Sequence, residues 1–177
     1  GAGINALARQ ARADIVVVDM GVAADLSELA QAGKILSRSV GLGTRNMGAG
    51  PAMTRQEAIR SLEAGIQVAR ELTHAADVFG TGDMGIANTT PSSAIVAVFG
   101  GLSAASVTGR GTGITGKLLS HKAAVIEKAI ELNQPDRNDA LDVLAKVGGF
   151  EIGGIAGLIL GAETGPERIS APSPSAP

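Results

Sequence analysis

The sequence predicts an α/β fold with a mostly parallel β-sheet. Short runs of β-branched and apolar residues alternate with longer stretches in which apolar residues recur at helical spacing, and glycine-rich turns follow the short runs. This alternation is typical of βαβ units, in which parallel strands are covered by helices. With 177 residues, the chain has the usual length of a single domain.

Two short strands are expected in the first half of the chain. Asp14–Asp19 (DIVVVD) places four β-branched residues in a row, which predicts a strand buried on both faces. Ala76–Gly80 (ADVFG) predicts a second short buried strand. Between them, the glycine-rich segment Ser37–Met53 is expected to be a loop. It contains Arg45 and Asn46, and it fits either a binding loop or a plain surface connection.

The remaining elements are expected to be mostly helical. Thr54 and Glu57 form a capping box that opens a helix from Arg55 to about Thr73. Thr90 is expected to cap the next helix, with Pro91 at its first position. Ser103–Val107 is a short strand-like run, and three later helices are expected at Lys117–Asn133, Asn138–Val147 and Phe150–Gly161.

The composition argues against several classes of protein. The net charge is −2 and charged residues make up 18% of the chain, so nucleic acid and anionic membranes are not expected partners. Aromatic residues are only 2%, which removes platforms for base stacking. The chain has no cysteine, which fits a cytoplasmic protein. No apolar run reaches the roughly 18 residues that a membrane-spanning helix needs.

The two ends of the sequence differ from the rest. The chain starts at Gly1 without a methionine, inside a helical pattern and without the apolar segment of a signal peptide, so we expect a fragment or a processed form. Residues 163–177 (ETGPERISAPSPSAP) are rich in proline and serine, and we expect a disordered tail there. The expected domain therefore covers residues 1–162. The abrupt change in composition suggests a shifted reading frame or an artificial junction.

The stretch GTGDMGIANTTP, residues Gly80–Pro91, is the first candidate site. Ligands of open α/β sheets bind at the carboxyl ends of strands, and a helix N-terminus attracts phosphate or carboxylate. A tight turn with a Thr-Pro cap would explain Thr90 and Pro91, but it would not explain Asp83, Asn88 and Thr89 together. A ligand site and a plain turn both remain possible from the spacing alone.

The stretch GRGTG, Gly109–Gly113, is a second candidate, although a plain loop is favoured when it is taken alone. Lys122 on the following helix could reach an anion held between the two glycine-rich loops, or it could be an ordinary solvated lysine. His74 and His121 have no partners at metal-ligand spacing, so neither a metal ion nor another cofactor is expected.

Four motifs, in this order, resemble one known family: GTRNMGAGPAMTRQEA, GDMGIANTTPSSAI, GRGTGI and VGGFEIGGIAGLILGA. The family is the nicotinate-nucleotide–dimethylbenzimidazole phosphoribosyltransferases (CobT), and the resemblance covers residues 1 to about 162. It implies a doubly wound, Rossmann-like sheet, the core of the family's large domain, in a homodimer. It also implies transfer of phosphoribose from nicotinate mononucleotide to 5,6-dimethylbenzimidazole, giving α-ribazole 5′-phosphate and nicotinate, a step in cobalamin biosynthesis.

The resemblance also implies which residues form the site. Those expected around the phosphoribosyl group are Met84, Gly85, Asn88, Thr89, Thr90, Gly109, Arg110, Gly111, Thr112, Gly113 and Lys122. Asp83 would assist catalysis at a position where the family commonly has glutamate, and the shorter side chain keeps the charge but loses reach.

Relative to the family, the chain is truncated at both ends. The family's general base is a glutamate in a Gly-Glu-Gly-Thr-Gly stretch near its C-terminus, and this sequence contains no such stretch. We therefore expect little or no turnover from this chain alone. The alternatives are a non-catalytic module that binds nucleotide or phosphate, and a structural fragment that oligomerises.

Overall fold

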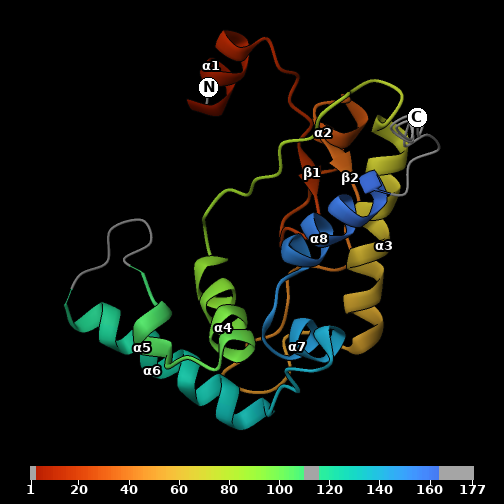
Figure 1. Cartoon of the computed structure of the whole chain (residues 1–177). Helices are drawn as coiled ribbons and strands as arrows, with labels where there is room; N and C mark the ends of the chain where they lie inside the picture. Colours follow the sequence, from red (N-terminus) through yellow and green to blue (C-terminus); the bar gives the residue numbers. More distant parts are fainter. Residues whose placement is uncertain (1–2, 110–115, 164–177) are drawn as a thin grey trace, which may run out of the picture. The chain divides into compact units, whose positions relative to one another are not determined.

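The computed structural model describes residues 3–109 and 116–163 (Figure 1). Within these ranges the chain forms eight helices and one two-stranded parallel sheet. It divides into two compact units, Gly1–Gly43 and Thr44–Pro177.

The first unit contains the sheet. Its elements are α1 (Gly3–Ala11), β1 (Val18–Asp19), α2 (Ser27–Gln31) and β2 (Leu36–Ser37). The two strands are parallel, with Val18 opposite Leu36 and Asp19 opposite Ser37. The Asp19 carboxylate accepts hydrogen bonds from two backbone N–H groups just beyond β1, and so stabilises the turn that leaves the strand. The sequence analysis did not predict α2 and β2.

Both predicted strands need correction. Only Val18 and Asp19 of Asp14–Asp19 form a strand, and the preceding Ile15, Val16 and Val17 are exposed, so this strand is not buried on both faces. Ala76–Gly80 is irregular, with the Val78 side chain 83% exposed. β-branched residues favour an extended backbone, but a strand also needs a partner for its hydrogen bonds. In the described residues, only β1 and β2 supply partners to each other.

The second unit is helical. Its elements are α3 (Arg55–Leu72), α4 (Thr89–Gly100), α5 (Ala104–Val107), α6 (Lys117–Asn133), α7 (Ala140–Val147) and α8 (Phe150–Glu163). The predicted helices are therefore confirmed within about two residues at each end. Ser103–Val107 was wrongly given as strand-like: Ser103 accepts a hydrogen bond from the Ser106 N–H, which closes a single helical turn, α5.

The predicted start of α4 was also wrong. The helix begins at Thr89 with Asn88 in the capping position, and Pro91 is its third residue. The Asn88 side chain makes no capping hydrogen bond, but its backbone carbonyl accepts from both the N–H and the hydroxyl of Ser92. Proline is tolerated throughout the first turn of a helix. A Thr-Pro pair therefore predicts that a helix starts nearby, but it does not specify which residue is the first.

Helices α3 and α8 lie side by side with their backbones in contact (Figure 1). Gly153, Gly157 and Gly161 recur every four residues and so share one side of α8. A Cβ atom added to Gly157 would overlap the backbone carbonyl of Leu62 on α3. One added to Gly65 on α3 would approach the Leu158 nitrogen on α8 to 2.7 Å. Glycine is therefore required for this close approach.

A second packing centre joins α4, α5, α6 and α7. Its buried side chains are Ala94, Ala104, Ala123, Ile126, Val143 and Val147. The loop before α3 is attached to this centre through Asn133, whose side-chain amide donates 2.7 Å to the Met47 carbonyl. The Met53 N–H donates to the Ala145 carbonyl of α7, and its side chain is buried. Residues of this loop therefore belong to the core.

The predicted capping box at the start of α3 is confirmed. The Glu57 N–H donates to the Thr54 hydroxyl oxygen over 3.1 Å, and the Glu57 carboxylate accepts from the Thr54 N–H over 2.6 Å. The same carboxylate accepts from the Arg45 guanidinium over 2.6 Å. The hydrogen bonds from Arg45 and from the Thr54 backbone lower the pKa of Glu57 from 4.5 to about 2.

A Glu57→Gln change is expected to lower the free energy of unfolding at pH 7 by about 0.5–1 kcal/mol, because the charge-assisted part of this cap is lost. A lowered native pKa stabilises the fold above the unfolded value, and this contribution is lost as pH falls through the native value. The difference from wild type should thus shrink between pH 4.5 and about 2. Urea unfolding followed by circular dichroism across this range measures it.

Glu63→Gln is the matched control, because Glu63 is exposed on the same helix. Its effect should be small and should not follow the acid titration of Glu57. An equal, pH-independent effect of both changes would contradict the role given to the Glu57 charge.

Candidate functional site

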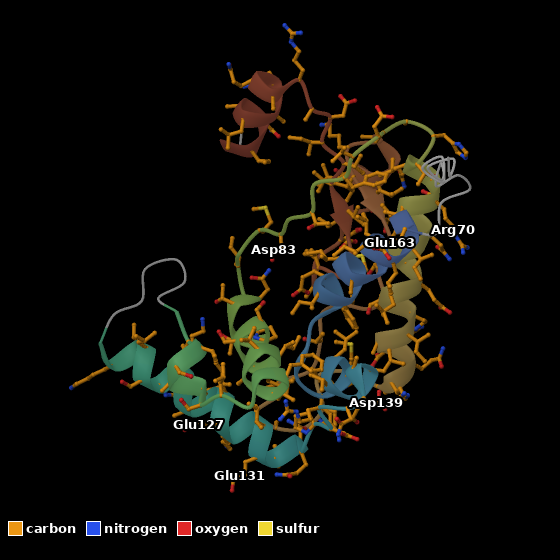
Figure 2. All side chains as sticks on the ribbon, in the orientation of Figure 1. Arg70, Asp83, Glu127, Glu131, Asp139 and Glu163 are labelled. Atoms are coloured by element: carbon orange, nitrogen blue, oxygen red, sulfur yellow. The ribbon has the colours of Figure 1, made fainter. Side chains whose placement is uncertain are left out.

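A cleft in the second unit brings together several of the predicted site residues. Its volume is about 300 Å³, and it is lined by Asp83, Asn88, Thr89, Ser92, Ser93, Gly109 and Lys122. These residues come from the segment before α4, the first turns of α4, the end of α5 and the first half of α6. Figure 2 shows Asp83 on the segment that leads down into α4. The volume is at the lower end of the range for small-molecule sites.

Lys122 connects two sides of this cleft. Its ammonium group donates a 2.8 Å hydrogen bond to the hydroxyl oxygen of Thr89, the first residue of α4. Within ranges 3–109 and 116–163, no carboxylate forms an ion pair with it. The ammonium group therefore has two further donor protons for a ligand.

The N-terminus of α4 forms the part of the cleft wall next to Lys122. The first backbone N–H groups of a helix have no intrahelical acceptors, and they carry a partial positive charge. No acidic residue lies in the first turn of α4 to neutralise that charge. The ammonium group and this helix end are thus directed at one cleft, and both favour an anion.

Asp83 is the one carboxylate among the described residues that line the cleft. It accepts a 2.6 Å hydrogen bond from the Gly85 N–H, which folds the loop into a tight turn. Gly85 has a φ of +68°, a conformation that glycine adopts without strain. The cleft consequently has a positive side, at Lys122 and α4, and a negative group at Asp83.

The predicted site residues fall into three groups. Asp83, Asn88, Thr89, Gly109 and Lys122 line the cleft. Met84, Gly85 and Thr90 adjoin it in sequence but do not line it, and the Met84 side chain is 77% exposed. Arg110, Gly111, Thr112 and Gly113 lie outside the described residues.

The sequence analysis missed Ser92 and Ser93, which also line the cleft. They lie four residues after Asn88 and Thr89, so helical spacing puts them on the same face of α4. This spacing could have predicted both serines as site residues. It was not applied, because the helix was expected to start only at Thr90, which left Asn88 and Thr89 outside it. The Ser93 hydroxyl donates 3.2 Å to the Val107 carbonyl and so holds the end of α5 against α4.

The loop containing Arg45 and Asn46 borders a separate pocket of about 510 Å³. The three cations in its wall already have partners, since Arg45 pairs with Glu57, Arg55 with Asp139 and Lys146 with Asp142. Because these three positive charges are already paired with carboxylates, the pocket is not expected to attract an anion. The contacts of this loop with Glu57 and α7 favour the plain connection over the binding loop.

The described part of the chain offers neither a metal site nor a membrane-spanning helix. No three His, Asp or Glu side chains lie close enough together there to hold a metal ion. None of the helices in these residues combines the length and the apolar character needed to cross a membrane.

The sequence matches the family described as "Phosphoribosyltransferase" over residues 1–166. It is 62% identical over 162 residues to a protein of Syntrophotalea carbinolica and 56% identical over 160 residues to one of Desulfotalea psychrophila. Both relatives are named nicotinate-nucleotide–dimethylbenzimidazole phosphoribosyltransferase. The matches cover 92% and 90% of this chain but 46% and 45% of the relatives. The chain thus spans just under half the length of these curated relatives.

A solved structure of a protein with this name has a similar fold. The crystal structure of CobT from Thermus thermophilus superposes with a TM-score of 0.83 at 38% sequence identity. The match covers 92% of this chain and 48% of that one. Together with the parallel pairing of β1 and β2, it confirms the α/β fold class predicted from the sequence.

Proposed function

The chain belongs to this phosphoribosyltransferase family, and on that premise we propose that its cleft binds the phosphoribosyl group of nicotinate mononucleotide. The observation that carries the proposal is the Lys122–Thr89 hydrogen bond, which fixes beside the N-terminus of α4 an ammonium group that forms no ion pair with the described residues. A phosphate dianion suits this arrangement, because the helix N–H groups and the ammonium protons can all donate to its oxygens.

Asp83 has a separate role in this proposal. Nicotinate mononucleotide carries a positive charge on its pyridinium ring, and positive charge develops on the ribose as the bond at C1′ breaks. A carboxylate in the same cleft stabilises that charge if it lies near C1′. Lys122 would thus hold the phosphate, while Asp83 would face the reacting end of the sugar.

The proposed reaction is phosphoribosyl transfer to 5,6-dimethylbenzimidazole. The C1′–N bond to nicotinate breaks, and a new C1′–N bond forms with the acceptor, giving α-ribazole 5′-phosphate for cobalamin. We further propose that the protein works as a cytoplasmic homodimer. Exposed apolar side chains on α4, such as Val96 and Phe99, supply surface that a partner subunit could cover.

Turnover by these 177 residues alone is proposed to be weak or absent, because the sequence lacks the Gly-Glu-Gly-Thr-Gly stretch. A second candidate is a module that binds the nucleotide without reacting it. Both candidates require donor binding, and an assay for α-ribazole 5′-phosphate separates them. A structural fragment would bind no donor.

The test is a calorimetric titration of the chain with nicotinate mononucleotide and with nicotinate riboside, which lacks the phosphate. We expect the nucleotide to bind about 100-fold more tightly or better, the value of two or so hydrogen bonds between charged groups at about 1.5 kcal/mol or more each. Equal affinity for the two ligands, or no binding of the nucleotide at millimolar concentration, would overturn the proposal.

A further inference from the structure

Ser93 joins two parts of the cleft wall, one on α4 and one just beyond α5. It lies in the second turn of α4, lines the cleft and is 9% exposed. Its hydroxyl donates a 3.2 Å hydrogen bond to the backbone carbonyl of Val107, the last residue of α5. Gly109, two residues further along the chain, also lines the cleft. This hydrogen bond therefore connects the wall on α4 with the wall at Gly109.

The end of α5 has few other attachments. Because α5 is a single turn, its own hydrogen bonds hold its end only weakly. The last carbonyls of a helix lack intrahelical donors, and hydroxyl groups satisfy two of them here. Thr108 donates to the Ala104 carbonyl, within the same segment, and Ser93 donates to the Val107 carbonyl. Among the described residues, the Ser93 bond is the one hydrogen bond that joins α4 to residues 107–109.

The body of α5 is held by apolar packing that does not involve the Ser93 hydroxyl. Ala104 of α5 and Ala94 of α4 are buried in the same packing centre, and α4, α5 and α6 are in contact with one another (Figure 1). Gly109 is different, because a Cβ atom added there would have no neighbour within 4 Å. Loss of the hydroxyl should thus leave the chain folded and release only the end of α5 and Gly109.

On these contacts, and resting on the proposed function, we propose that Ser93 is a positioning residue for the donor nucleotide. Its hydroxyl holds Gly109 against α4, where Gly109 and Lys122 can contact the phosphoribosyl group from two sides of one cleft. A wall that is fixed before the ligand arrives improves affinity, since the segment does not have to be ordered on binding.

The test compares Ser93→Ala with wild type, using the full chain. Alanine removes the hydroxyl and is the most favourable residue within a helix. Calorimetric titration should show that nicotinate mononucleotide binds about three- to tenfold more weakly, the value of one hydrogen bond between neutral groups. In the ligand-free chain, the NMR order parameters of the Thr108 and Gly109 N–H groups should fall, because the bond that restrains them is lost.

Ser106→Ala is the matched control. Ser106 is exposed on α5 outside the cleft, and its hydroxyl donates 2.8 Å to the Ser103 carbonyl. The control should bind the donor within about twofold of wild type, as expected for a surface change. Equal weakening by both changes would overturn the role of Ser93.

Two further results would overturn this inference alone. One is an unchanged donor affinity in Ser93→Ala. The other is weaker binding with unchanged order parameters, which would mean that the hydroxyl contacts the ligand directly and does not act through Gly109. Absence of donor binding by wild type would instead overturn the proposed function.

Discussion

Replacing Lys122 by alanine is expected to weaken the binding of nicotinate mononucleotide by about 30-fold or more, because a charge-assisted hydrogen bond of about 2 kcal/mol or more is lost. Among the described residues that line the cleft, Lys122 is the one cation. The effect should fall as salt is raised, since a partly exposed charge pair is screened. Calorimetric titration at two salt concentrations measures both quantities.

Lys128→Ala provides the control for this result. Lys128 lies on the same helix, α6, and is exposed outside the cleft. It should leave the affinity within about twofold of wild type, as a distant surface charge contributes little at physiological salt. If the two variants bind the donor equally well, Lys122 does not contact the phosphate.

Replacing Gly157 by alanine is expected to lower the free energy of unfolding by about 2–4 kcal/mol, as overpacking at a rigid contact does. Helix propensity alone predicts the opposite sign, because alanine is about 1 kcal/mol more favourable than glycine within a helix. The contact decides the outcome: the new methyl group would overlap the Leu62 carbonyl, and backbone cannot move aside as a side chain can. Urea unfolding monitored by circular dichroism gives the difference.

Gly3→Ala is the comparison for Gly157→Ala. Gly3 is also helical, but a Cβ atom there has no neighbour within 4 Å, so its replacement should be neutral or slightly stabilising. A Gly157→Ala variant as stable as wild type would show that α3 and α8 separate easily, contrary to the packing described above.

Sequence patterns predicted the helices better than the strands, for a physical reason. The capping box at Thr54 and the apolar repeat behind it are local signals, and α3 begins and ends within a residue of its expected bounds. A strand depends on a partner that the sequence does not specify. Residues Ala76–Gly80 have suitable side chains but no paired neighbour among the described residues, so they remain irregular.

The candidate site was predictable only in part. Asp83, Asn88 and Thr89 were candidates because a tight turn with a Thr-Pro cap would not explain the three together. The place of Lys122 on the helix after the second glycine-rich loop allowed it to reach the same anion, and the family resemblance implied the same role; Lys122 lies 33 positions after Thr89.

The segment that carries Asp83 differs from the helices around it in one respect. Residues 76–87 make no backbone–backbone hydrogen bonds to the described part of the chain, whereas Lys122 lies within a regular helix. Local opening of such a segment requires little free energy, so its amide hydrogens should exchange with solvent early. A ligand that contacts both Asp83 and Lys122 must restrict the segment, and slower amide exchange there would report occupancy even when no product forms.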